Sequence, residues 1–213
     1  MRNQLNPRNR YSYKSNILDK IVNIDIGGYT RPITGEKRNG DVIYILKNPR
    51  YIFFAIIDGI GHGDVANAIA EETKSFLIDN HNSDIQYVIQ KAHEHMLGTE
   101  GAVIGIGCII DDNFSFGSLG NINCKIVNAE NFDMLSTDGL LGVRGRTPKI
   151  TSKKLNNNDV IFMFSDGING NFNSSEFNNY HLFSSEILAK KIVKNSGSPF
   201  DDASMITVKV QIT

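Results

Sequence analysis

Two kinds of hydrophobic periodicity alternate along the chain, and their order limits the folds that are open to it. Apolar, β-branched and aromatic runs predict strands over residues 16–28, 41–48 and 51–58. Helical spacing follows over 62–77 and 83–97 and returns at 184–196. Further strand-like runs, separated by Asn, Gly and Asp turns, cover 101–111, 113–120, 123–130, 133–139, 149–155, 159–167 and 204–213. This order predicts an α+β fold with antiparallel sheets and helices on their outer faces.

The composition provides for one hydrophobic core. Because 40% of the 213 residues are hydrophobic, we expect a single domain over residues 17–213, preceded by a flexible N-terminal arm over 1–16. The net charge of −1 gives no field that would favour nucleic acid or an anionic membrane as a partner. The longest apolar run, Tyr51–Ile57, is far below the roughly 20 residues that cross a bilayer, and the basic start carries no apolar signal core. We therefore expect a cytoplasmic protein.

The stretch YIFFAIIDGIGHGDVANAIA, residues 51–70, has two chemical interpretations. An apolar strand, alternating glycines and a helix resemble the start of a dinucleotide-binding βαβ unit. However, Asp58 would then place a carboxylate beside a pyrophosphate, and the segments that follow carry antiparallel turn signals. The ribose contact would fall to Asp79, which lies in the polar segment DNHNSD and not at a strand end. The other interpretation is that Asp58 holds a metal ion.

Three further acidic sites stand at the ends of apolar strands in the same way. Asp166 follows the run DVIFMFS, Asp201 and Asp202 precede SMITVKV, and Asp41 opens DVIYIL. Asp-Gly pairs also make simple turns, and that explanation suffices for any one of them alone. Carboxylates that converge at one sheet edge, however, need cations to offset their repulsion, and a set of oxygen ligands suits Mg²⁺ or Mn²⁺. Two such ions about 4 Å apart would activate a shared water against a phosphate ester.

Four segments together carry a resemblance to a known family: RPITGEKRNGD, FAIIDGIGHGDVA, MFSDGI and DDASMITV. In this order, across residues about 20 to 213, they resemble the metal-dependent protein serine/threonine phosphatases (PPM, or type 2C), and specifically their bacterial SpoIIE-type branch. The resemblance implies a four-layer α/β/β/α sandwich of two antiparallel sheets flanked by helices, with the metals at one end. The small single-domain form to which the chain is similar acts on stressosome proteins that control a general stress sigma factor.

The resemblance also implies roles for individual residues. Asp58 matches the aspartate that bridges two metal ions, and Gly59 matches the glycine whose carbonyl oxygen binds one of them. Asp166 matches the ligand in the SDG motif, and Asp201 matches the first residue of the D-[DN]-x-[ST] motif. Asp41 matches the acidic residue that holds the second metal, largely through water. The implied cofactors are two Mn²⁺ or Mg²⁺ ions, and the implied catalytic residues are Asp58 and Asp166.

Residues next to these implied ligands would support them. Asp202 would neighbour the ligand set without joining it. Gly61 and Gly63 let the chain turn sharply after the metal loop and begin the helix, whose alanines permit close packing on the sheet. His62 is a candidate general acid for the leaving seryl oxygen, although a histidine at a helix start also serves as a cap.

The substrate phosphate has no clear arginine partner in the sequence. Eukaryotic members of the family bind it with an arginine shortly before the first acidic motif. Arg31 and Arg38 are nearby, but neither has the matching spacing. Arg144 and Arg146, in GVRGRTP, are a candidate phosphate clamp, and exposure to solvent is the simpler alternative.

The remaining histidines and the cysteines indicate structural roles. His93 and His95 are two apart on a helix, so they face different ways, cannot form an i, i+4 metal pair and are expected to be exposed. Cys108 and Cys124 each lie in an apolar strand-like run without C-x-x-C spacing, so we expect reduced core residues. The absence of a cysteine from any phosphate-binding loop argues against a cysteine-based phosphatase.

The leading hypothesis is a metal-dependent protein phosphatase that hydrolyses phosphoserine or phosphothreonine by direct attack of metal-bound hydroxide. Its partner would be a phosphorylated regulatory protein of a bacterial stressosome or sigma-factor pathway. The alternative is a catalytically weak binding module with the same fold, which regulates a signalling partner by occupying it.

Overall fold

The computed structural model describes residues 11–14, 21–128, 131–144, 146–170 and 182–212. In this part of the chain the helices are α1 (Gly63–Asn80), α2 (Ile85–His95) and α3 (Ser185–Ser196). The strands are β1 (Tyr11–Lys14), β2 (Ile21–Arg31), β3 (Asp41–Lys47), β4 (Ile52–Gly59), β5 (Ala102–Ile110), β6 (Asn113–Leu119), β7 (Asn123–Val127), β8 (Phe132–Asp133), β9 (Ile150–Lys154), β10 (Val160–Phe164) and β11 (Ala203–Ile212).

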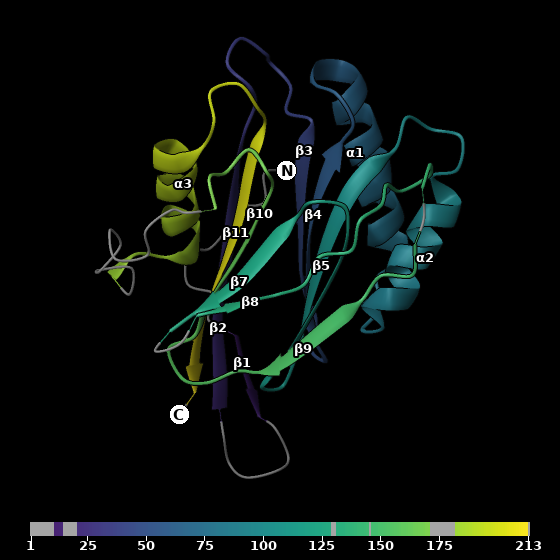
Figure 1. Ribbon diagram of the computed structural model, residues 1–213. Helices are drawn as coiled ribbons and strands as arrows, with labels where there is room; N and C mark the ends of the chain where they lie inside the picture. Colours follow the sequence, from purple (N-terminus) through teal and green to yellow (C-terminus); the bar gives the residue numbers. More distant parts are fainter. Residues whose placement is uncertain (1–10, 15–20, 129–130, 145, 171–181, 213) are drawn as a thin grey trace, which may run out of the picture.

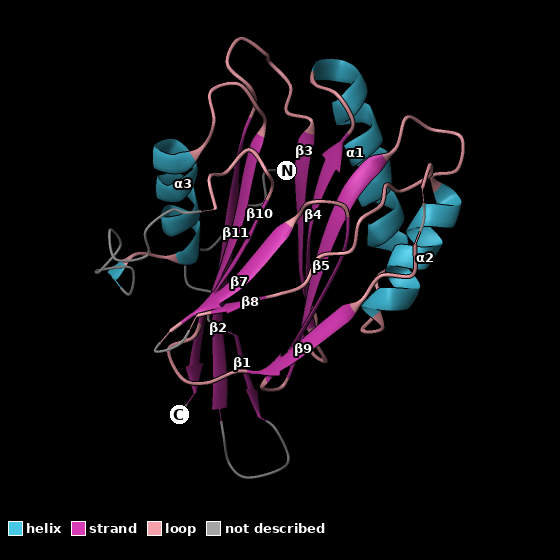
Figure 2. Ribbon diagram, viewed as in Figure 1, coloured by secondary structure: helices cyan, strands magenta, loops and turns pink. Residues whose placement is uncertain are grey.

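The strands form two antiparallel sheets that pack face to face, with helices outside both (Figures 1 and 2). One sheet has the order β1-β2-β11-β10-β7-β8, and the other has the order β3-β4-β5-β6-β9. Helix α3 covers the first sheet by packing on β2 and β11, whereas α1 and α2 cover the second through β3, β4, β5 and β6. The predicted α+β class and the four-layer α/β/β/α sandwich are therefore confirmed.

The central strands are continuous apolar runs because both of their faces are covered. In β4, Phe54 and Ile56 point into the core between the two sheets, and Phe53, Ala55 and Ile57 point toward α1 and α2. All five side chains are completely buried. The same division holds in the other sheet, where β10 contributes to the intersheet core and to a third cluster under α3. Alternation along a strand thus distributes side chains between two cores.

Small residues allow the helices to approach the sheets closely. A Cβ added to Gly27 in β2 would lie 2.6 Å from the backbone nitrogen of Glu186, so the first turn of α3 rests directly on the strand. On the opposite side of the sandwich, Ala66 and Ala70 of α1 are fully buried against the second sheet. The predicted close packing of the alanines in α1 is confirmed.

One predicted strand is largely replaced by an irregular connection. The run 133–139 was expected to be a strand, but β8 ends at Asp133 and the chain then crosses from the first sheet to β9 in the second. After Asp133 the segment bonds to the start of β7 and to the turn between β6 and β7, where the Met134 N–H donates to the Cys124 carbonyl at 2.9 Å. Ser136 donates to the Ile122 carbonyl at 3.0 Å, and the Thr137 carbonyl accepts from Gly120 N–H at 2.8 Å.

The N-terminal segment also contains a strand. Tyr11–Lys14 pairs antiparallel with residues 21–24 of β2, inside the range where the sequence predicts an arm. The remainder of that range, 1–10 and 15–16, lies outside the described residues. None of the helices described is both long and apolar enough to cross a membrane.

Candidate metal centre

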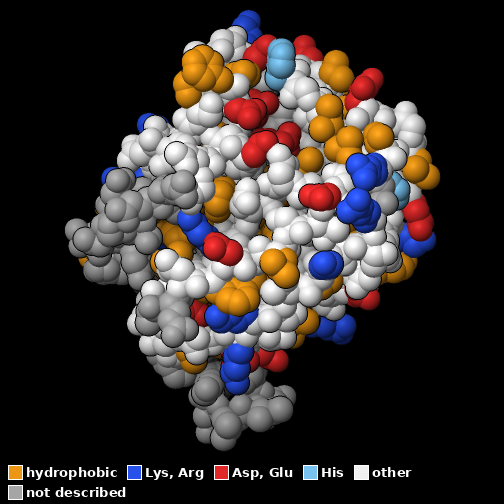
Figure 3. Space-filling view, viewed as in Figure 1, with side chains coloured by type: hydrophobic (Ala, Val, Ile, Leu, Met, Phe, Trp, Pro, Cys, Tyr) orange, Lys and Arg blue, Asp and Glu red, His pale blue; other side chains and the backbone are white. Residues whose placement is uncertain are grey.

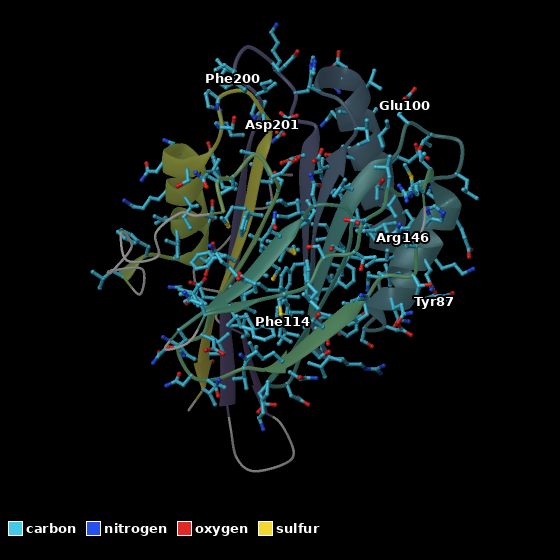
Figure 4. All side chains as sticks on the ribbon, viewed as in Figure 1. Tyr87, Glu100, Phe114, Arg146, Phe200 and Asp201 are labelled. Atoms are coloured by element: carbon cyan, nitrogen blue, oxygen red, sulfur yellow. The ribbon has the colours of Figure 1, made fainter. Side chains whose placement is uncertain are left out.

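The four predicted acidic positions lie at one end of the sandwich, on or next to strands from both sheets. Asp41 begins β3 and Asp58 lies near the end of β4, and the two are direct cross-strand partners. Asp166 follows β10, and Asp201 precedes β11, the antiparallel partner of β10. Figure 4 places Asp201 at this end, and Figure 3 shows acidic side chains gathered on the surface there. The fold brings together positions that are far apart in the sequence.

A hydrogen bond between the two sheets fixes Asp41. The hydroxyl of Ser165 donates to Asp41 Oδ2 at 2.7 Å, and Ser165 Oγ accepts from the backbone N–H of Ser204 at 3.0 Å. Both Asp41 and Ser165 are buried. Burial raises the pKa of Asp41 to about 7; the Ser165 bond opposes the rise, and the charges of Asp202 and Asp166 add to it.

Asp58 lies within the electrostatic field of all the other carboxylates. Its pKa is raised to about 8, with burial as the largest cause. The negative charges of Asp41, Asp166, Asp201 and Asp202 follow as further causes. Among these carboxyls, Asp58 is therefore the one on which the charges of all the others act.

Asp166 and Asp201 form the exposed side of this group. Asn121 Nδ2 donates to Asp166 Oδ2 at 2.6 Å and orients that carboxylate. The pKa of Asp201 is raised by partial burial and then by the charge of Asp166, and its Oδ1 accepts from the N–H of Asp202 at 2.9 Å. Both side chains are therefore held in place while remaining accessible from solvent.

Asp202 is buried and holds the loop that leads into β3. Its Oδ2 accepts from the Gly40 N–H at 2.9 Å, and its Oδ1 accepts from the Ile33 N–H at 2.8 Å. A Cβ on Gly40 would lie only 2.7 Å from Asp202 Oδ2, so the glycine permits this contact. Both of its oxygens accept from backbone N–H groups, and through Gly40 Asp202 holds the backbone directly before Asp41.

The glycines from the end of β4 to the start of α1 are needed for different structural reasons. Gly61 and Gly63 have φ values of +96° and +71°, which confirms the sharp turn that the sequence predicts. Gly59 is required for packing, because its Cβ would lie 2.1 Å from the carbonyl oxygen of Ala66 in α1. The helix thus rests against the backbone that carries Asp58.

The donor set suits a hard divalent cation. Asp41, Asp58, Asp166, Asp201 and the Gly59 carbonyl offer only oxygen atoms, the ligands that Mg²⁺ and Mn²⁺ prefer. Burial is the largest cause of the raised pKa values of Asp41 and Asp58, and neighbouring carboxylates raise them further; a cation would offset this repulsion. In the ranges that the structure describes, no three Asp, Glu, His or Cys side chains are already placed to hold a metal ion. The carboxylates converge without forming a complete coordination shell.

His62 lies at the surface beside this centre. It precedes α1, but its side chain makes no capping hydrogen bond to the helix. Instead, His62 Nδ1 lies 3.3 Å from Glu36 Oε1, in a pair that is open to solvent. Capping is therefore excluded as its role, and the general-acid role stays a prediction.

The candidate arginines are differently engaged. The Arg31 guanidinium donates to the Ser198 carbonyl, which ties it to the loop before Asp201. Arg38 forms an exposed ion pair with Asp64 at 3.0 Å. Arg144 and Arg146 are exposed, and Figure 4 shows Arg146 away from Asp201, beside α2. This placement favours solvent exposure over a phosphate clamp for Arg146.

The other histidines and the cysteines are largely structural. Cys108 and Cys124 are buried and free, as predicted, and burial raises the pKa of the Cys108 thiol to about 12. His95 is exposed, pairing with Glu72 at 3.6 Å. The expectation that His93 is exposed is wrong, because its Nδ1 accepts from the Gly142 N–H at 3.0 Å and the residue is partly buried.

Two residues at the centre were not identified as such from the sequence. Ser165 stands directly before Asp166, inside the SDG motif, so its position was a usable signal. Asn121 follows β6 in a turn, and nothing in the local sequence connects it with Asp166. Both contacts join segments that only the folded chain brings together.

The dinucleotide interpretation of residues 51–70 does not hold. A βαβ unit requires parallel strands, whereas β4 pairs antiparallel with both β3 and β5. Asp79, the implied ribose ligand, is exposed near the end of α1, well after the glycine loop. The loop therefore belongs to the acidic centre.

Comparison with known proteins gives both a sequence relative and structural neighbours. No family model matches the chain. The phosphoserine phosphatase RsbX of Bacillus subtilis (strain 168) is 22% identical over 139 residues, which span 63% of this chain and 70% of RsbX.

Two solved structures are similar over nearly their full length. One, described as "The bacterial stressosome: a modular system that has been adapted to control secondary messenger signaling", has a TM-score of 0.81 and 29% identity, covering 87% of this chain and 98% of that one. The other, a crystal structure of RsbX in complex with magnesium, has a TM-score of 0.76 and 20% identity, covering 90% of this chain and 96% of that one.

Proposed function

We propose that this chain, which has the PPM (type 2C) phosphatase fold and is similar to its SpoIIE/RsbX-like branch, is a divalent-metal-dependent phosphatase. Its substrate would be a phosphoserine or phosphothreonine on a bacterial regulatory protein, such as a stressosome component. The observation that carries this proposal is the convergence of Asp41, Asp58, Asp166 and Asp201 at one end of the sandwich, with the pKa of Asp58 raised to about 8.

Five residues of the chain would provide the metal ligands. Asp58 and Asp166, with Asp41, Asp201 and the Gly59 carbonyl, would hold two Mg²⁺ or Mn²⁺ ions. When bound, these ions supply the positive charge that screens a phosphate ester and acidifies the attacking water.

Neighbouring residues keep these carboxylates in place. Ser165 orients Asp41 by a hydrogen bond across the sheets, and Asn121 orients Asp166. Asp202 fixes the loop before β3 through two backbone N–H groups. His62 is exposed at the edge and would supply a proton to the leaving seryl oxygen, with Glu36 setting its orientation.

A binding module is the second candidate function. It is favoured by one observation: within the described residues the carboxylates do not yet form a group of three that is placed to hold an ion. A protein of this kind would dock on a regulatory partner without turning it over. Against this candidate, a protein that only docks on a partner does not need the buried carboxylates Asp41 and Asp58 side by side.

Phosphate release from a phosphoserine peptide separates the two candidates. The purified chain is assayed with Mn²⁺, with Mg²⁺ and with EDTA, beside Asp166→Asn and the matched control Asp79→Asn, an exposed position near the end of α1. We expect metal-dependent release that is lost in Asp166→Asn and kept in Asp79→Asn. No release under any condition, combined with tight binding of a phosphoprotein, would favour the binding module. Release that is equally fast in EDTA would contradict the metal-dependent mechanism.

A further inference from the structure

Phe200 is the most exposed of the large hydrophobic side chains described, and it stands directly before Asp201. Its exposed fraction is 85%. Figure 4 shows Phe200 and Asp201 at the same end of the sheets. A single exposed apolar residue is ordinary in a protein surface and needs no explanation by itself. Two further observations point to a role for Phe200: the hydrogen bonds that hold its loop, and the apolar side chains exposed near it.

The loop that carries Phe200 is held by hydrogen bonds from several directions. The Ser198 N–H donates to the Gly167 carbonyl at 2.8 Å, and the Thr34 N–H donates to the Pro199 carbonyl at 3.2 Å. The Phe200 N–H donates to Ser198 Oγ at 3.1 Å, and the Arg31 guanidinium also holds the Ser198 carbonyl. The backbone from which the aromatic ring projects is therefore held in place, which lowers the backbone part of the entropy cost of a contact with a ligand.

Other apolar side chains are exposed next to the acidic centre. Ile60 follows Gly59 directly, is 42% exposed, and its N–H is bonded to the Gly101 carbonyl at 3.1 Å. Val65, in the first turn of α1, is also exposed. Figure 3 shows hydrophobic side chains on both sides of the acidic patch. A phosphorylated residue that reaches the carboxylates would place its neighbours in the substrate chain against this apolar rim.

We propose that Phe200 is a substrate-specificity residue, which contacts an apolar side chain flanking the phosphorylated serine or threonine. This inference rests on the proposed phosphatase function and narrows its substrates to phosphoproteins with apolar residues beside the phosphate. A glycine flank would make no contact with the ring, and an acidic flank would gain no apolar contact from it. A small aryl phosphate has no flanking residues and would not sense it.

The test compares three substrates under Mn²⁺: p-nitrophenyl phosphate, a phosphoserine peptide flanked by leucines, and the same peptide flanked by glycines. We expect the wild type to prefer the leucine peptide by about tenfold in kcat/KM. Phe200→Ala should abolish this preference mainly by raising KM, and it should leave p-nitrophenyl phosphate and the glycine peptide unchanged. Phe200→Leu should retain most of the preference. Leu182→Ala, an exposed position before the start of α3, is the matched control and should behave as wild type.

The outcomes separate the two proposals. Equal turnover of both peptides by the wild type, or an unchanged preference in Phe200→Ala, would overturn the specificity role and leave the phosphatase function standing. A parallel loss on all three substrates in Phe200→Ala would also overturn it, because the residue would then support the site's structure. No turnover of any substrate by the wild type would contradict the phosphatase function, and with it the specificity role.

Discussion

Asp41 and Asp58 stand opposite each other in the β3–β4 ladder, where two like charges destabilise a cross-strand pair. Burial is the largest cause of the rise in both pKa values, and neighbouring carboxylates raise them further. Without a cation, the folded protein therefore holds protons on these groups that the unfolded chain would release near neutral pH. At the residue scale, the burial and mutual repulsion of Asp41 and Asp58 lower the free energy of unfolding of the metal-free protein, and a bound cation would offset this cost.

Replacing Asp58 separates stability from activity. Asp58→Asn keeps the side chain's size but removes a carboxylate that would hold the metal ions, so we expect phosphate release to be lost. The substitution also removes one charge that its neighbours repel. In EDTA at pH 8, the free energy of unfolding should rise by about 1–3 kcal/mol, measured by urea unfolding. If the variant instead lost the circular dichroism spectrum of the folded protein, Asp58 would be a structural residue.

The stability of the metal-free protein should fall as pH rises. The carboxyl pKa values in the folded state, about 7 for Asp41 and about 8 for Asp58, lie above the ordinary value of 3.8. Between pH 4 and 8 the folded state thus binds more protons than the unfolded state, and the free energy of unfolding decreases across that window.

Urea unfolding in EDTA at pH 5, 6.5 and 8 measures this slope. The contribution of other titrating groups to this slope cancels when the wild type is compared with Asp58→Asn. The free energy of unfolding of Asp58→Asn should exceed that of the wild type by a margin that grows from pH 5 to pH 8. A margin that stays constant with pH would show that the Asp58 carboxyl does not titrate in this range.

Helix α1 and the loop before it form a unit with the end of β4. The helix backbone lies against Gly59, and the turn at Gly61 and Gly63 directs the chain from the sheet into the helix. At the scale of this element, the alternating glycines serve packing and turning, and they keep Asp58 at the edge where Asp41 lies. The same residues also match the pattern of a phosphate-binding loop, because both uses need a backbone without side chains.

Two glycine substitutions should differ in cost. Gly59→Ala places a methyl group 2.1 Å from the Ala66 carbonyl oxygen, so we expect it to lower the free energy of unfolding by about 3 kcal/mol. Gly61→Ala meets no atom within 4 Å and is strained only by its φ of +96°, so its cost should be about 1 kcal/mol. Urea unfolding of both variants measures the difference, and equal costs would contradict the packing role of Gly59.

At the scale of the whole molecule, the acidic end is where the two sheets contribute residues to one site. Asp41 and Asp58 come from one sheet, and Asp166 and Asp201 flank strands of the other. A cation bound by both pairs would act as a bridge between the sheets. We therefore expect Mn²⁺ at 100 times its dissociation constant to raise the free energy of unfolding by about 2.7 kcal/mol. Thermal unfolding with and without Mn²⁺ measures this effect, and an unchanged midpoint would contradict a bridging cation.

Most of the architecture could be predicted from the sequence, because each element carries its own periodicity. The strand runs around Phe53 and Met163 and the helix from Gly63 are local patterns, and four short motifs indicated the family and the two-sheet sandwich. The crossing after Asp133 could not be predicted, since its residues resemble a strand locally and the passage to β9 in the other sheet is set by the whole fold. The Ser165–Asp41 and Asn121–Asp166 bonds were also inaccessible, because their partners meet only in the folded chain.

We infer that Asp41, Asp58, Asp166 and Asp201 form one centre that binds two divalent cations. Calorimetric titration of Mn²⁺ into the metal-free chain at pH 7.5, repeated in buffers of different ionisation enthalpy, tests it most directly. We predict two ions per chain with release of protons, because the raised pKa values of Asp41 and Asp58 leave protons for the metal to displace. Asp58→Asn should bind fewer ions and release fewer protons, with Asp79→Asn unchanged. Absence of binding, or binding that Asp58→Asn leaves intact, would contradict the claim.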